Sequence, residues 1–163
     1  MSTPHEPRLT RALRALLQTQ RVAALGTLDA NGKPFVSMVP FAIEPTAGAL
    51  VIHVSLLAPH TRNLLTDPAV SLMVMVPEVA GEPVHALPRV SLEGVAERLQ
   101  PESADWLAGR HCYLARFPDA EPMTQLGDFS FVRIQVLGAR QVAGFGAARP
   151  LDADEIAAVL RPQ

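Results

Sequence analysis

Apolar and polar residues alternate in short runs along most of this chain, and proline, glycine and asparagine separate the runs. Such alternation, or a short continuous apolar run, is typical of β-strands with one or both faces buried. Asn31-Gly32 between two such runs is a strong hairpin signal, because both residues tolerate positive φ. Pro40 interrupts one run and predicts an edge, a bulge or a ligand-facing stretch. The predicted strands are 21–28, 34–43, 49–54, 69–76, 89–99 and 129–136.

Helical spacing appears at both ends of the chain and between strands. Leucines at three- and four-residue intervals predict an amphipathic helix within residues 1–20, and Asp152 caps a predicted helix within 152–163. Shorter helices are expected after Pro59 and over 101–117. The chain is therefore expected to be a single domain, 1–163, that is mainly β with flanking helices. Hairpin connections favour a closed barrel or a sandwich.

Composition narrows the class of protein. The 163 residues are 48% hydrophobic and 18% charged, which is enough apolar material for one core. A net charge of -2 gives no reason to expect nucleic acid or an anionic membrane as a partner. One cysteine, Cys112, excludes an internal disulfide and favours the cytoplasm. No run is long enough to predict a membrane span.

The segment from Ser55 to Asn63 offers the clearest chemistry. A strand ends at Ser55, and His60, Thr61 and Arg62 follow at the start of a helix. A strand-end hydroxyl beside free helical N–H groups forms an anion cradle. The alternative is an ordinary helix start with a solvated basic residue.

No catalytic motif is evident elsewhere, so no catalytic residue and no metal ligand are assigned. The histidines do not fall at metal-ligand spacing. His53 lies in a predicted strand and is expected in the core, whereas His85 lies in a proline-rich loop and is expected to be solvated.

Four ordered segments resemble a known family. They are VAALGTLDANGKPFVSMVPFAI, LVIHVSLLAPHTRNLLTDPAVSLMV, RVSLEGVAERL, and DFSFVRIQV with GFGAARPL. Together they resemble the FMN-binding split-barrel proteins related to pyridoxamine-phosphate oxidase, in a branch close to bacterial haem-utilisation proteins. The resemblance runs from about Arg21 to Leu151. It implies a six-stranded antiparallel split barrel that forms a homodimer, with FMN at the interface. It assigns cofactor contacts to Ser37, Met38, Val39, Pro40, Ser55, His60, Thr61, Asn63, Arg89 and, from the partner chain, Phe145.

The resemblance implies an FMN-dependent oxidoreductase and leaves its substrate and electron donor open. True pyridoxamine-phosphate oxidase activity is not expected, because the C-terminal stretch GFGAARPL has no histidine beside its arginine. One alternative is a haem-binding or haem-degrading protein that uses the same interface cleft without flavin. Another is a non-catalytic flavin carrier. An absorption spectrum separates flavin from haem.

Overall fold

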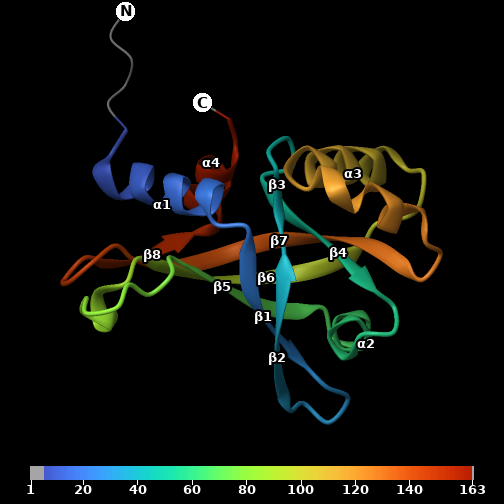
Figure 1. Ribbon diagram of the computed structural model, residues 1–163, viewed down its shortest axis with the longest axis horizontal. Coiled ribbons are helices and arrows are strands. Elements are labelled where there is room, and N and C mark those ends of the chain that lie inside the picture. Colours follow the sequence, from blue (N-terminus) through green and yellow to red (C-terminus); the bar gives the residue numbers. More distant parts are fainter. Residues whose placement is uncertain (1–5, 163) are drawn as a thin grey trace, which may run out of the picture.

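A computed structural model describes residues 6–162, and it gathers the strands of this part of the chain into one antiparallel sheet (Figure 1). The sheet has eight strands in the order β2-β1-β5-β6-β7-β4-β3, with β8 paired to β7. The elements, in chain order, are α1 (Arg8–Thr19), β1 (Val22–Leu28), β2 (Pro34–Pro40), β3 (Ala42–Glu44), β4 (Ala49–Ser55), α2 (Pro59–Thr66), β5 (Ala69–Met75), the 3₁₀ turn η1 (Val84–Ala86), β6 (Arg89–Arg98), α3 (Ala104–Arg116), the 3₁₀ helix η2 (Pro118–Gln125), β7 (Phe129–Val142), β8 (Ala148–Asp152) and α4 (Ala153–Leu160).

The sheet curls because its two edges are adjacent in the sequence. β2 and β3 stand at opposite ends of the strand order, yet only Phe41 separates them along the chain. The Phe41 N–H donates to the carbonyl of Arg21 at 3.1 Å, which ties this corner to the start of β1. Pro40 has no N–H to donate, and β2 ends there. The result is a half-barrel, which confirms the predicted split-barrel class, mainly β with flanking helices.

Two differences from the predicted fold have local causes. The break at Pro40 divides the predicted strand 34–43 into β2 and β3. After β7 the chain turns back and adds β8, so the described residues contain eight strands rather than six. α1 and α4 lie within the ranges 1–20 and 152–163 that were predicted to hold terminal helices, and residues 1–5 and 163 of those ranges lie outside the described residues.

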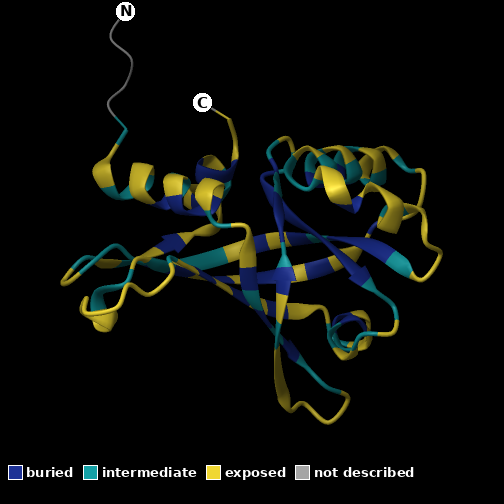
Figure 2. Cartoon of the chain, viewed as in Figure 1, coloured by how far each residue is buried: buried dark blue, intermediate teal, exposed yellow. Residues whose placement is uncertain are grey.

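The inner face of the sheet forms the main core. Leu25, Leu72, Leu92 and Ile134 point inward and are almost completely buried, and leucines of α1 and apolar residues of α4 pack with them. A smaller cluster around Phe131 lies beneath α3. Figure 2 shows buried and exposed residues alternating along the long strands. One face of each strand is therefore covered by the chain itself.

The outer face of the sheet is not covered in the same way. Along β5, the buried residues alternate with Ala69, Ser71, Met73 and Met75, which face outward. An outward row facing water usually carries charged or polar side chains. Here it is small or apolar, which leaves an uncovered apolar surface.

Gly94 of β6 lies opposite a bulge in β7 and has no room for a side chain. A Cβ atom there would lie 2.8 Å from both the Gln135 carbonyl oxygen and Ile134 Cγ2. We predict that Gly94→Ala lowers the free energy of unfolding by about 1–3 kcal/mol, because β7 must shift to admit the methyl group. Gly127→Ala is the matched control, since nothing lies within 4 Å of its Cβ position. Chemical denaturation checks both variants, and equal stabilities would contradict the prediction.

Candidate functional site

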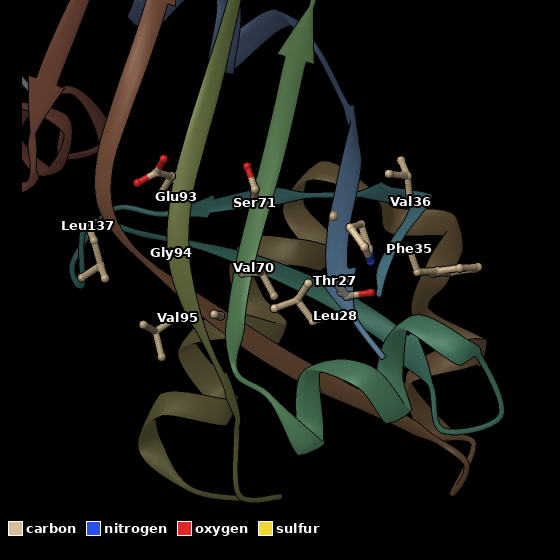
Figure 3. Close-up of a pocket in the computed structure, with 13 residues that line it drawn as sticks. Thr27, Leu28, Phe35, Val36, Val70, Ser71, Glu93, Gly94, Val95 and Leu137 are labelled. Carbon is tan, nitrogen blue, oxygen red and sulfur yellow. The ribbon is translucent and has the colours of Figure 1, made fainter. Parts of the chain in front are cut away.

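An apolar groove of about 490 Å³ crosses the outer face of the sheet (Figure 3). Its size falls within the usual range for small-molecule sites. Glu93 is the one charged residue among those that line it, and Figure 3 shows Leu137 at one side of the groove and Val36 at the other. The lining residues are Gly26, Thr27, Leu28, Pro34, Phe35, Val36, Ala69, Val70, Ser71, Glu93, Gly94, Val95 and Leu137.

Strand register explains why the surface is hollow here. Gly26 on β1 pairs with Val36 on β2 and with Ser71 on β5. Directly opposed residues share a face of the sheet, so the missing side chain at Gly26 leaves a trough between its neighbours. Two residues earlier on β1, the small residue Ala24 likewise pairs with two larger residues, Met38 on β2 and Met73 on β5.

The bulge between β6 and β7 shapes the far wall of the groove. Glu93 pairs with Gly138 and Gly94 pairs with Val136, so Leu137 is the extra residue of the bulge. Bulges of this kind redirect a side chain out of the regular pleat. Leu137 is 56% exposed and lines the groove. The backbone conformation of the bulge therefore causes the exposure of Leu137.

A second hollow of about 350 Å³ lies further along the outer face, and we name it the methionine hollow. Ser71 of the groove and Met73 of the hollow are alternate residues of β5 and share its outward row. Arg89 is four residues before Glu93 on β6, a span of about 13 Å at strand spacing. The hollow is lined by Met73, Met75, Val84, His85, Leu87 and Arg89.

Two side-chain hydrogen bonds join α2 to the β1–β2 hairpin. Ser37 Oγ and His60 Nδ1 lie 3.0 Å apart, and Asn63 Nδ2 donates to Thr27 Oγ1 at 3.1 Å. Burial lowers the pKa of His60. The structure thus brings three predicted site residues, Ser37, His60 and Asn63, to one place, although none of them lines the groove.

The hydroxyl groups of Ser55 and Thr61, two of the predicted cofactor contacts, are directed to the protein itself. Ser55 Oγ accepts the N–H of Leu57 at 3.2 Å. Thr61 is only 1% exposed, and its Oγ1 has no hydrogen-bond partner among the described residues. Neither side chain is presented to the outer face.

The other residues predicted to contact the cofactor lie at several separate places in the structure. Met38 lies on the outer face, Val39 is buried in the core, and Pro40 ends β2. Arg89 lines the methionine hollow. Phe145 is 92% exposed in the β7–β8 turn and lines neither the groove nor that hollow.

His53 is a core histidine, as expected from its strand position. It is 8% exposed and lies among the rings of Phe131, Phe129 and Tyr113, with centroid distances of 4.4, 5.0 and 5.7 Å. Burial lowers the pKa of His53 to about 4. Across residues 6–162, no three His, Cys, Asp or Glu side chains are grouped so that they could hold a metal ion.

Fold and groove together define a split-barrel protein with an apolar groove, a candidate ligand site, on the outer face of its sheet. The sequence profile of the family described as "Pyridoxamine 5'-phosphate oxidase" matches residues 9–143. This chain belongs to that family.

Several relatives share most of this chain. "Heme oxygenase HutZ" of Vibrio cholerae is 31% identical over 91% of this chain and 84% of its own length. "Non-canonical heme oxygenase HOZ, chloroplastic" of Arabidopsis thaliana is 34% identical over 83% of this chain and 40% of its own length. A solved heme binding protein from Mycobacterium smegmatis has 32% identity and a TM-score of 0.83, over 94% of this chain and 62% of that one. This chain thus spans less than two thirds of the last two proteins.

The expectation of FMN as the cofactor is wrong. The relatives above are named for haem and not for flavin. That expectation rested on the family resemblance, with an anion cradle at the start of α2 as its support, and no residue of 55–63 lines the apolar groove. None of the helices within residues 6–162 is long and apolar enough to cross a membrane.

Sequence reasoning missed the groove residues. Gly26, Ser71, Glu93 and Leu137 come from four strands, and only the register brings them together. The available signal was the outward row of 69–75, where small and apolar residues replace the charges of a solvent-facing strand.

His53 generates a prediction about pH. Its pKa is about 4 in the folded protein and 6.5 as a model value, so the unfolded chain takes up a proton first as the pH falls. The stability that His53 contributes is complete above pH 6.5 and is lost towards pH 4. Between about pH 7 and pH 5, the free energy of unfolding should fall by about 2 kcal/mol more in the wild type than in His53→Phe.

Urea denaturation at both pH values measures this difference. His111→Gln is the control, because His111 is an exposed histidine of α3 and should leave the pH dependence as in the wild type. Identical pH dependence in wild type and His53→Phe would show that the buried ring does not titrate as described.

Proposed function

We propose that this protein binds haem in the apolar groove, between two copies of the chain, and acts in haem utilisation. The observation that carries the proposal is a broad groove with no cationic side chain in its lining. Such a surface suits a flat, largely apolar macrocycle better than a phosphorylated cofactor. Relatives at 31% and 34% identity named as heme oxygenases support the same ligand.

A second copy of the chain is the proposed cover for the outer face. Large apolar side chains stand exposed there on β2, β5, β6 and β7, and an exposed patch of this kind marks an interaction surface. They are Val36, Met38, Met73, Met75, Val95 and Leu137. Covering this face by a partner would also close the groove against water. A homodimer is therefore part of the proposal.

The side chains of this face fit the parts of a haem molecule. The groove's aliphatic walls would contact the macrocycle and exclude water from it. Arg89, beside the methionine hollow, places positive charge where carboxylates of a bound haem can lie. Haem iron, when bound, supplies oxygen-binding and one-electron chemistry.

Arg149, the arginine of the stretch GFGAARPL, is not placed to bind a substrate phosphate. Arg149 Nε donates to Gln141 Oε1 at 3.0 Å, and its Nη2 donates to Thr10 Oγ1 at 3.3 Å. Gln141 in turn donates to the Leu9 carbonyl at 2.8 Å. This part-buried network joins β8, β7 and α1. It supports the expectation that the protein does not oxidise pyridoxamine phosphate.

Leu137 tests the haem site. We predict that Leu137→Glu weakens haem binding about tenfold or more, or about 1.4 kcal/mol, because a carboxylate enters the apolar groove and repels the haem carboxylates. Titration of the purified protein with ferric haem, followed by absorbance, gives the dissociation constant.

The matched control is Leu107→Glu on α3, since Leu107 is 52% exposed and lies outside the groove. It should bind haem like the wild type. Light scattering of each variant should give twice the 17.5 kDa chain mass for the wild type and the control. Equal haem affinity in all three proteins, or no haem binding by the wild type, would contradict the proposed function.

A further inference from the structure

The floor of the apolar groove follows one row of paired residues that crosses five strands. In order from β2 to β7, the row is Val36, Gly26, Ser71, Glu93 and Gly138. Neighbouring strands lie about 4.8 Å apart, so the row spans about 19 Å. A flat ligand lying over Gly26 and Ser71 therefore has bare backbone and one small hydroxyl group beneath its centre.

No group in the groove is suited to hold iron beneath such a ligand. The side chains that hold haem iron in proteins are those of histidine, cysteine, methionine and tyrosine. None of these is among the described residues that line the groove. The hydroxyl group of Ser71 is committed to the sheet, because its Oγ donates to the Leu92 carbonyl at 3.1 Å. His85 lines the methionine hollow, which has no residue in common with the groove. The lining fits the ring of haem and does not fit its iron.

The apolar walls act on the ring alone. Contact with aliphatic side chains stabilises a bound ligand roughly in proportion to the apolar area removed from water, and a metal-free ring of the same outline buries the same area. We propose that the groove binds the tetrapyrrole ring itself, with or without a metal, and gives iron no ligand. The inference rests on the proposed function, because it defines the class of ligand for the same groove.

The one charged side chain of the lining determines which way the ligand's carboxylates lie. Glu93 is exposed on the outer face and forms no ion pair within the described part of the chain. Ser91, two residues earlier on β6, pairs with Arg140, and Arg89 begins the strand. Glu93 repels the carboxylates of a tetrapyrrole and the arginines attract them, so the carboxylate edge of the ring lies towards Arg89. This preference is the same whether or not the ring holds a metal.

Two ligands that differ only in the metal test the inference. Ferric haem and its metal-free form, protoporphyrin IX, are titrated separately into the wild-type protein. Quenching of the fluorescence of Trp106, the only tryptophan, gives both dissociation constants. We expect the two constants to agree within about fivefold, because neither ligand gains a bond from the protein to a metal. Resonance Raman spectra of the ferrous haem complex should show no iron–histidine stretching band.

Glu93→Gln distinguishes a carboxylate that repels the ligand from one that binds iron. Removing the charge relieves both the repulsion and the cost of covering an unpaired carboxylate, so both ligands should bind about twofold to fivefold more tightly. Weaker binding of haem alone would show that Glu93 holds the iron. Glu102→Gln is the matched control, since it removes the same charge from an exposed residue outside the groove and should bind both ligands like the wild type.

The outcomes separate the two proposals. Haem that binds more than about fivefold more tightly than protoporphyrin IX overturns the inference and leaves the proposed function standing. An iron–histidine band in the wild type, or a loss of haem affinity alone in Glu93→Gln, does the same. A wild type that binds neither ligand overturns the proposed function and the inference with it. Far-UV circular dichroism of each variant confirms that a changed affinity is not lost folding.

Discussion

The outward rows of the central strands are the constraint on which the account depends. β5 buries valine and leucine on one face and presents Ala69, Ser71, Met73 and Met75 on the other. The curl of the sheet builds the main core on the inner face, and α3 covers the other face only near Val51 and Phe131. A second apolar face is therefore left over. An exposed apolar surface of this kind marks an interaction surface, and the cover proposed for it is a ligand together with a second copy of the chain.

Much of the fold could be predicted from local pattern. Alternation predicted β5 and β6, Asn31-Gly32 predicted the first hairpin, and Asp152 predicted the start of α4. In the structure Asp152 caps this helix and forms a capping box with Glu155. Pro40 was recognised as an interruption, since a residue without an N–H cannot donate to a ladder, but not as the point where one strand ends and another begins. The extra strand β8 was not, because its pairing with β7 depends on contacts formed after the chain turns back.

The candidate site was much less accessible to sequence reasoning. The helix start at His60 looked like an anion cradle, but the structure uses Ser37 and Asn63 to attach α2 to the first hairpin. The groove depends on a missing side chain at Gly26 and on a bulge that turns Leu137 outward. A single sequence gives no register, so residues from four strands cannot be recognised as neighbours. The family resemblance was correct, whereas the cofactor it suggested was not.

The most direct test of the account is a crystal structure of the protein with haem bound. The account predicts electron density for haem on the outer face, over Gly26 and Ser71, with a second chain covering it. The proposed site lies on strands of the sheet, so small shifts of the helices would not obscure the result. Haem bound at α2 or beneath α3, or an outer face left bare in every copy, would contradict it.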